Sequence, residues 1–279
     1  MIANSQYELL DFGQGEKLES FAGLIVRRET PSAIGNRRES ERWGDFHVRG
    51  RVVDDSFLWT GEIPEDWCLD AGEFQFGLRQ TKTGQVGIFP EQADNWAWIT
   101  NCRLPLEGKR ALNLFAYTGG TTMALAARGV EVVHVDSAKS VVNWARQNAT
   151  RSRLEDSNIR WIVEDVMTFV AREIKRGNQY DIVVADPPSF GRGPKGEFWK
   201  IQRDIEGLVQ SLAQLTSGAS TLGILSCHTP GIDHRDLKRF VKNAFSLRRS
   251  SGEGFEMFLD SAAGARLPSG HCFRWLNPI

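Results

Sequence analysis

From about Gly108 onward, short runs of apolar and β-branched residues alternate with longer segments of helical period. This alternation is typical of βαβ units, in which helices connect the parallel strands of one sheet by right-handed crossovers. The predicted strands are 110–115, 131–135, 159–163, 181–185 and 221–226, and the predicted helices are about 119–128, 138–151, 166–176, 203–216 and 233–246.

The end of the chain has a different pattern. Segments 253–260 and 271–276 are strand-like, and the link between them contains Leu267–Gly270 instead of a long helix. Two closing strands without a helix between them predict an antiparallel hairpin. The sequence therefore predicts a Rossmann-like α/β fold, whose seven-stranded, mostly parallel sheet has an antiparallel C-terminal edge hairpin.

Residues 1–105 lack this alternation. Residues 52–98 are rich in Trp, Phe and Gly, with turn signals at Asp70–Gly72 and Lys82–Gly84. Such signals predict hairpins. We expect a β-rich N-terminal region at 1–105 and the α/β domain at 106–279, which is a reasonable division for a chain of this length.

The composition excludes several classes of protein but does not indicate a particular function. Hydrophobic residues make up 41% and charged residues 25%, as in ordinary globular proteins. No apolar run reaches the ~18 residues of a membrane span, and the first six residues do not resemble a signal peptide. The four cysteines lack CxxC spacing, so neither a zinc site nor a disulfide framework is indicated. We expect a cytoplasmic monomer or homodimer without a metal.

The net charge of -1 argues against a protein that holds nucleic acid mainly by its overall field. Locally, residues 27–51 contain seven arginines and four acids. The arginine fork suits phosphate. A solvated, partly paired surface is nevertheless the favoured interpretation of such a mixed run.

The turn after the first predicted strand of the α/β domain indicates a cofactor site. Asp136 closes the second strand, 23 residues beyond Asn113, where a carboxylate can bind ribose hydroxyls or cap a helix. The turn Tyr117–Gly120 has two adjacent glycines but no GxGxxG pattern. S-adenosylmethionine has no pyrophosphate to be cradled at a helix N-terminus, so this turn favours it over NAD.

Two further strand ends carry candidate chemistry. Asp165 follows the third strand, where it can accept a hydrogen bond from the adenine amino group or cap the next helix. The fourth strand ends in Asp186-Pro187-Pro188-Ser189-Phe190. Two consecutive prolines fix φ and remove two backbone donors, which predicts a rigid loop at the carboxyl edge of the sheet, where ligands bind.

Four motifs resemble one known family: KTGQVGIFPEQ at 82–92, LNLFAYTGG at 112–120, VDSAKSVVNWARQNA at 135–149 and DPPSF at 186–190. Over about residues 57–279 the chain is similar to the large-subunit ribosomal RNA methyltransferase I branch of the class I S-adenosylmethionine-dependent methyltransferases. The characterised ribosomal members of that family carry an N-terminal PUA RNA-binding module. The first 50 residues here are too short and dissimilar to form one.

The resemblance implies methylation of ribosomal RNA and a role for each strand end. By that resemblance Phe89 and Gln92 help close the cofactor pocket, Asp136 and Asp165 bind ribose and adenine, and Asp186 lies beside the methyl donor. The predicted cofactor residues are Phe89, Gln92, Asn113, Phe115, Ala116, Tyr117, Thr118, Gly119, Asp136, Ser137, Asp165, Val166, Asp186 and Pro187.

Cys227 follows the fifth predicted strand and is the candidate nucleophile. Thiolate attack on carbon 6 of cytosine makes carbon 5 able to accept a methyl group. His228 would lower the pKa of the thiol or take its proton, and Asp186 would assist proton movements. A small buried hydrophobe is the alternative role of such a cysteine, but the resemblance favours catalysis, because the related family has a cysteine here.

Another chemistry uses the same loop. In methylation of exocyclic amino groups, an Asp/Asn-Pro-Pro-aromatic loop binds the amine while the ring stacks on a flipped base. Ser189 shifts Phe190 by one position, which weakens this interpretation without eliminating it. A non-nucleic-acid acceptor and a catalytically silent binding protein also stay open. The predicted substrate residues are Pro188, Ser189, Phe190, Arg192 and Lys195, the last two on a flexible basic loop.

Overall fold

The computed structural model describes residues 6–193, 195–216, 222–247 and 252–276. The chain divides into two compact units. The first consists of Met1–Asp94, Gln147–Ser152 and Phe258–Ser269, and the second of Asn95–Arg146, Arg153–Met257 and Gly270–Ile279. The domain boundary after residue 105 stays a prediction.

The first unit contains a five-stranded sheet with the order β1-β2-β3-β4-β5. Strands β3 and β4 are parallel, and the other neighbours are antiparallel. A separate hairpin, β6–β7, turns at Gly72, where the sequence predicts a turn. The elements are β1 (Tyr7–Gly13), β2 (Glu16–Phe21), β3 (Leu24–Glu29), η1 (Ser40–Gly44), β4 (Val48–Val53), β5 (Ser56–Thr60), β6 (Cys68–Ala71), β7 (Phe74–Gly77) and η2 (Pro90–Gln92).

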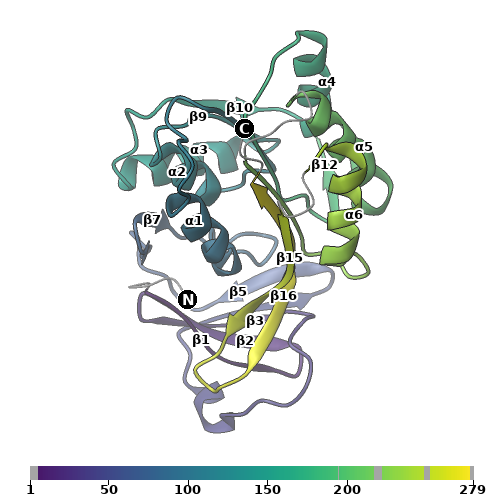
Figure 1. Ribbon diagram of the computed structural model, residues 1–279. Coiled ribbons are helices and arrows are strands. Elements are labelled where there is room, and N and C mark those ends of the chain that lie inside the picture. The colour runs from purple at the N-terminus through teal and green to yellow at the C-terminus, as the bar shows by residue number, and fades with distance from the viewer. Residues whose placement is uncertain (1–5, 194, 217–221, 248–251, 277–279) are drawn as a thin grey trace. The chain divides into compact units, whose positions relative to one another are not determined.

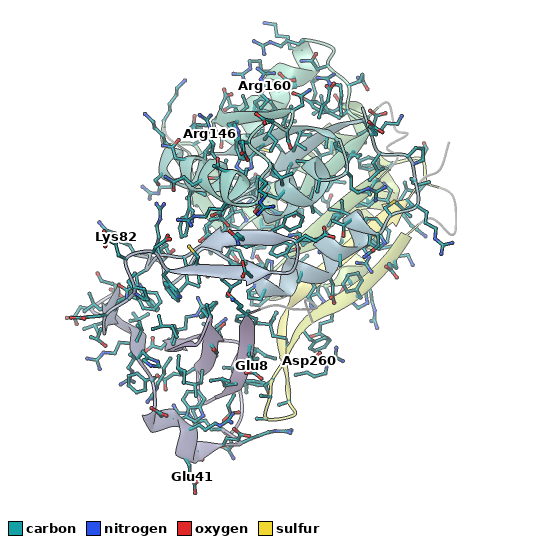
Figure 2. All side chains as sticks on the ribbon, turned by 90° about the vertical axis from the view of Figure 1, so that its left-hand side faces the viewer. Glu8, Glu41, Lys82, Arg146, Arg160 and Asp260 are labelled. Carbon is teal, nitrogen blue, oxygen red and sulfur yellow. The ribbon has the colours of Figure 1, made fainter. Side chains whose placement is uncertain are left out.

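Most charged side chains lie at the outside of each unit, as the labelled Glu41, Lys82 and Arg160 do in Figure 2. Glu19 and Arg28 are exceptions in the first unit. Both are buried, and the Arg28 Nε donates to Glu19 Oε2 at 2.5 Å. Burial would raise the pKa of Glu19, but the charges and hydrogen bonds of Arg28 and Lys17 lower it to about 2. The pair is therefore ionised at neutral pH, and loss of one partner would leave a costly buried charge.

The second unit confirms the predicted sheet. The seven strands have the order β10-β9-β8-β11-β14-β16-β15, and the segment Phe258–Ser269, which includes the end of β15 and the start of β16, is counted with the first unit. The first five run parallel, and β16 runs antiparallel to β14. The strands are β8 (Arg110–Leu114), β9 (Glu131–Asp136), β10 (Ile159–Val163), β11 (Ile182–Ala185), β14 (Leu222–Cys227), β15 (Gly252–Asp260) and β16 (Arg266–Leu276).

Helices cover both faces of this sheet. Helices α4, α5 and α6 lie on one side and α1, α2 and α3 on the other (Figure 1). Buried residues of β8, β11 and β14 form one apolar core with α4, α5 and α6. The helices are α1 (Ala93–Thr100), α2 (Gly120–Ala126), α3 (Lys139–Arg151), α4 (Val166–Lys175), α5 (Ile201–Gln214) and α6 (His234–Ala244). Among these described helices, none has the length and apolar character that crossing a membrane requires.

The structure corrects three expectations. The link at Leu267–Gly270 lies inside β16, and the chain turns at 261–265 instead, because Pro and Gly are tolerated where a strand bends or leaves an edge unpaired. Helix α1 occupies part of the segment 52–98, for which only hairpins are predicted. Residues after Ser189 form a small hairpin, described below. Thr221, the first residue of one predicted strand, lies outside the described residues.

Candidate active site

The strand order creates a switch point between β8 and β11. These two strands are neighbours although β9 and β10 separate them in the chain. Ligands bind outside the carboxyl ends of the strands at such a point. Leu114 and Ala185, the last residues of the two strands, are paired in register, and the Asp186 amide donates to the Leu114 carbonyl at 3.4 Å. The predicted cofactor turn and the Asp186 loop therefore begin side by side.

The turn between β8 and α2 has an unusual backbone. Phe115 and Tyr117 have φ values of 54° and 47°, and Gly119 has φ 89°. Non-glycine residues in this left-handed region cost ~1–2 kcal/mol each, and such strain concentrates at functional sites. The Ala116 amide donates to the Val135 carbonyl at 3.1 Å, which fixes the turn to β9. The turn is thus held in a strained, defined shape at the switch point.

The two adjacent glycines of this turn have different roles. Gly119 supplies the left-handed conformation that precedes α2. A Cβ on Gly120 would lie 2.3 Å from the indole of Trp96, on α1. Glycines in such a turn commonly let the backbone approach a ligand. The structure shows that Gly120 makes room for a side chain of the protein itself.

Asp136 ties the cofactor turn to the end of β9. Its two carboxylate oxygens accept hydrogen bonds from the amides of Tyr117 and Ala138, both at 3.0 Å. Burial raises the pKa of Asp136, although the amides of Ala138, Tyr117 and Ser137 act in the opposite direction. This carboxylate positions the turn, and it is half-buried at the edge where ribose binding is predicted.

Two other predicted cofactor residues make contacts within the fold. Asn113 is buried and its amide donates to the Thr122 hydroxyl at 2.9 Å, which in turn lies 2.8 Å from Nδ1 of His134. Burial lowers the pKa of His134 to about 3, so this ring is neutral at physiological pH. Asp165 is the N-cap of α4 and accepts from the Thr168 amide at 2.8 Å. Its contact with adenine stays a prediction.

The remaining predicted cofactor residues differ in exposure. Phe89 and Gln92 belong to the first unit, where Phe89 precedes η2 and Gln92 is buried. Their part in a cofactor pocket stays a prediction. In the second unit the buried members are Ala116, Thr118, Val166 and Pro187, and Ser137 is half-buried.

Asp186 is held by two polar side chains at one oxygen. Ser226 Oγ donates to Oδ1 of Asp186 at 2.7 Å, and Nε2 of His228 lies 3.2 Å from the same oxygen. His228 and Asp186 are each partly exposed. The arrangement of Asp186, Ser226 and His228 can orient a bound acceptor by hydrogen bonds and can accept or hold a proton. Ser226 was not predicted, yet it precedes Cys227 on β14 and therefore projects from the opposite face of the sheet.

Cys227 lies in the apolar core of the second unit. Its side chain is 0% exposed, and the Thr229 amide donates to its sulfur at 3.4 Å. Burial raises the pKa of the thiol, although the hydrogen bonds with Thr229 act in the opposite direction. The thiol is therefore protonated at neutral pH in this conformation. His228, the expected partner of the thiol, has its Nε2 3.2 Å from Oδ1 of Asp186.

The segment after Ser189 corrects the flexible-loop expectation. Strand β12 (Phe190–Arg192) pairs antiparallel with β13 (Phe198–Lys200). Phe190 is opposite Lys200 and Arg192 is opposite Phe198, and opposite residues share a face. We call these four side chains the hairpin face. Phe190 is 60% and Phe198 50% exposed, so the face presents two aromatic rings and two cations to solvent.

Trp199 projects from the other side of this hairpin. It is buried, its indole Nε1 donates to the Pro188 carbonyl at 2.7 Å, and its ring lies 5.1 Å from that of Phe115. Ser189 and Thr229 form a hydroxyl contact at 2.7 Å, and Lys195 is exposed in the turn. Trp199 thus links the hairpin face to both the Asp186 loop and the cofactor turn. Neither Phe198 nor Trp199 was predicted.

Comparison with known proteins identifies the family. A family model described as S-adenosylmethionine-dependent methyltransferase matches residues 40–256, more than half of the chain. The chain belongs to this methyltransferase family. The residues at the switch point fit the cofactor, because the turn lacks a pyrophosphate cradle and Asp136 is available beside it. Within the described residues, no group of three His, Cys, Asp or Glu side chains is arranged to hold a metal.

Curated relatives match part of the methyltransferase. Ribosomal RNA large subunit methyltransferase I of Aeromonas hydrophila subsp. hydrophila is 34% identical over 51% of this chain and 35% of its own length. Ribosomal RNA large subunit methyltransferase K of Neisseria meningitidis serogroup B is 26% identical over 58% of this chain and 46% of its own. The methyltransferase therefore spans less than half the length of these two relatives.

Solved structures match nearly the whole methyltransferase. A SAM-dependent methyltransferase from Agrobacterium tumefaciens is 29% identical, with a TM-score of 0.88 over 98% of this chain and 90% of that one. A protein from Streptococcus mutans is 18% identical, with a TM-score of 0.74 over 97% of this chain and 74% of that one. At 18% identity the second likeness shows the fold alone.

Proposed function

We propose that this methyltransferase methylates a base of RNA, and that its substrate is large-subunit ribosomal RNA. The hairpin face carries the proposal. Exposed aromatic rings stack on unpaired bases, a contact worth ~1–3 kcal/mol per base, and Arg and Lys bind phosphates. Phe190 and Arg192 follow directly after the Asp186 loop, so a base stacked on this face has the carboxylate near it. The names of the curated relatives support the same substrate class.

The proposed cofactor residues and Asp186 have separate tasks. Bound S-adenosylmethionine supplies an electrophilic methyl group. The turn at Phe115–Gly119 and the Asp136 carboxylate hold the cofactor, and Trp199 fixes the hairpin against that turn. Asp186, with Ser226 and His228 at its oxygen, orients the base and manages its proton.

We expect a deletion of the gene to remove one methylated nucleoside from large-subunit ribosomal RNA. Mass spectrometry of RNA nucleosides, mapped to position in cells with and without the gene, measures this. Expression of the intact chain in the deleted strain should restore the modification, which controls for indirect effects. An unchanged set of RNA modifications, with cofactor binding intact, would favour a catalytically silent binding protein or a non-nucleic-acid acceptor.

For the acceptor atom we propose carbon 5 of cytosine. His228 takes the proton of the Cys227 thiol, the thiolate bonds to carbon 6, and carbon 5 takes the methyl group from the sulfonium of the cofactor. Asp186 then removes the proton from carbon 5, which expels the thiolate and restores the ring double bond. Cys227 ends β14 next to Ser226, which contacts Asp186, and the Thr229 amide can stabilise a thiolate. The burial of Cys227 counts against this chemistry, which requires RNA binding to expose the sulfur.

A base amino group is the second candidate acceptor. The buried, protonated thiol favours it, because this chemistry needs no nucleophile from the protein. Asp186 would accept a hydrogen bond from the amine while Phe190 stacks on the base. Both acceptors use the same loop and cofactor, but only methylation of carbon 5 needs the Cys227 thiolate.

The Cys227→Ser variant tests carbon 5. We expect it to lower methyl transfer by about 1,000-fold or more, because a hydroxyl at this position is a far weaker nucleophile than a thiolate. RNA that contains 5-fluorocytosine should form a covalent adduct with the intact enzyme and none with the variant, as seen by denaturing gel. Cys272→Ser, which alters another buried cysteine, is the control. Full methyl transfer by Cys227→Ser would move the acceptor to an amino group.

A further inference from the structure

The arginine-rich segment of the first unit forms a cluster around one carboxylate. Arg27 donates to Glu16 through both Nε, at 3.0 Å, and Nη2, at 2.5 Å. Arg37 also forms an ion pair with Glu16, and the Arg49 Nη2 lies 3.2 Å from Glu16 Oε1. Burial would raise the pKa of Glu16, but Arg27, Arg49 and Arg37 bring it below its ordinary value. Three positive charges thus meet one negative charge.

Glu16 does not accept hydrogen bonds from all the donor atoms of these arginines. The Nε atoms of Arg37 and Arg49 are buried without a hydrogen-bond partner among the described residues. Arg37 also stacks on Trp43, with its guanidinium 3.8 Å from the ring centroid. Stacked, unsaturated guanidinium groups are well arranged to bind phosphate. The cluster therefore lacks acceptor oxygens.

Two acids near the cluster, Asp11 and Glu39, have other partners, and Glu29, which lines the adjacent cavity, accepts a hydrogen bond from the Val52 amide at 2.9 Å. Asp11 accepts hydrogen bonds from the Trp43 indole and from the amides of Arg38 and Glu39. Glu39 pairs with the exposed Arg42. The cluster of Glu16, Arg27, Arg37 and Arg49 therefore keeps an excess of two positive charges.

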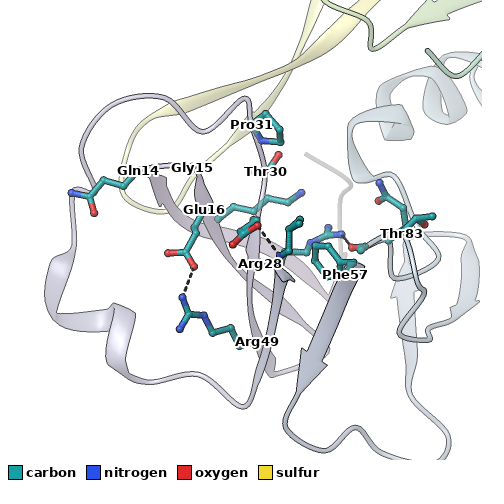
Figure 3. A pocket seen from close by; sticks show the side chains of 14 residues that line it. Gln14, Gly15, Glu16, Arg28, Thr30, Pro31, Arg49, Phe57 and Thr83 are labelled. Atoms are coloured by element: carbon teal, nitrogen blue, oxygen red, sulfur yellow. Dashed lines mark hydrogen bonds and ion pairs between the residues drawn. The ribbon is translucent and has the colours of Figure 1, made fainter. Parts of the chain in front are cut away.

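A cavity opens beside this cluster. It has a volume of about 540 Å³ and is lined by Glu16 and Arg49 on one side and by Phe57 and Thr83 on the other (Figure 3). This volume is typical of ligand-binding clefts, which measure roughly 300–1,000 Å³. Arg28 also lines the cavity, but it is paired with Glu19, so Arg49 is the lining arginine that belongs to the cluster.

We propose that this cavity binds a phosphate of the RNA backbone, with Arg49 in contact with the phosphate. Glu16 holds Arg49 in place, and Arg27 and Arg37 keep the local potential positive. The inference rests on the proposed function, because it names RNA as the ligand. The site lies in the first unit and is made by residues other than those of the hairpin face.

Binding of a fluorescein-labelled single-stranded RNA of about 15 nucleotides by the full-length protein tests the site. We expect Arg49→Gln to weaken binding about tenfold and to reduce the slope of log affinity against log salt by ~0.7, the value for one lost contact with single-stranded nucleic acid. Two arginines stay on Glu16 in this variant, so the fold should persist. Arg266→Gln is the matched control, since it removes an exposed arginine of the same unit that pairs with Asp260.

Glu16→Gln separates binding from support of the fold. If the cluster were purely structural, loss of the carboxylate would weaken RNA binding or leave it unchanged. A phosphate site gains one net positive charge, so we expect binding to tighten about threefold to tenfold even as the thermal midpoint falls. If this variant does not fold, Arg49→Gln alone decides.

Three outcomes overturn the site. They are RNA affinity of Arg49→Gln equal to that of Arg266→Gln, weaker or unchanged binding by folded Glu16→Gln, and no measurable binding of RNA by the intact protein at low salt. The proposed function is measured separately by methyl transfer from labelled S-adenosylmethionine into RNA. Binding that depends on Arg49 without methyl transfer would retain the site and reject the function. Methyl transfer into RNA at an unchanged rate in Arg49→Gln, together with unchanged RNA affinity, would retain the function and reject the site.

Discussion

Replacement of Asp186 by asparagine is expected to lower kcat for methyl transfer by about 100-fold to 10,000-fold, the usual range for loss of a positioned acid or base. Asparagine keeps the size of the side chain but removes its charge. Ser226 and His228 both converge on one oxygen of this carboxylate, and the amide oxygen of asparagine can still accept from them, so the expected loss comes from the missing negative charge and proton acceptor. Radioactive methyl transfer from S-adenosylmethionine into RNA measures the loss.

The cofactor affinity and the protein fold should be far less affected by Asp186→Asn than kcat. Calorimetric affinity for S-adenosylmethionine and the thermal midpoint separate a chemical defect from lost binding or folding. Asp260→Asn is the control, because it neutralises an exposed carboxylate that pairs with Arg266. A kcat within about threefold of the intact enzyme would remove Asp186 from the reaction.

The sheet of the second unit is predictable because each strand is a short apolar run bounded by a helix of clear period. All five predicted parallel strands are found within one or two residues of their expected bounds. The small hairpin was missed for the opposite reason. Strands β12 and β13 have three residues each, too few for a periodic pattern, and the glycines between them suggest a loop.

The chemistry of the site is less predictable than its location. The sequence places Ser226, Cys227 and His228 at one strand end, but strand geometry sends consecutive side chains to opposite faces. Ser226 therefore joins Asp186 while Cys227 enters the core. The arginine cluster is hard to predict for the same reason, because Arg27 and Arg49 meet Glu16 only through the pairing of β2, β3 and β4. Pairing between strands cannot be read from composition.

Gly120→Ala is expected to destabilise the protein by about 3 kcal/mol and to weaken S-adenosylmethionine binding more than about tenfold. The new Cβ would lie 2.3 Å from the Trp96 indole, so either α1 or the cofactor turn must move. Gly207→Ala is the matched control, because Gly207 lies inside α5 and a Cβ added there would have no neighbouring atom within 4 Å. Alanine at that position should stabilise the protein by about 0.5–1 kcal/mol.

The contact with Trp96 can be tested directly by a double-mutant cycle. Trp96→Leu removes the indole atoms that meet the Cβ, so Gly120→Ala should cost far less in that background than alone. Chemical unfolding measures the free energies, and calorimetry measures cofactor affinity in each variant. Additive effects would mean that Gly120 is needed for the ligand and not for Trp96. A strong coupling would instead show that a helix absent from the sequence-based prediction sets the shape of the cofactor turn.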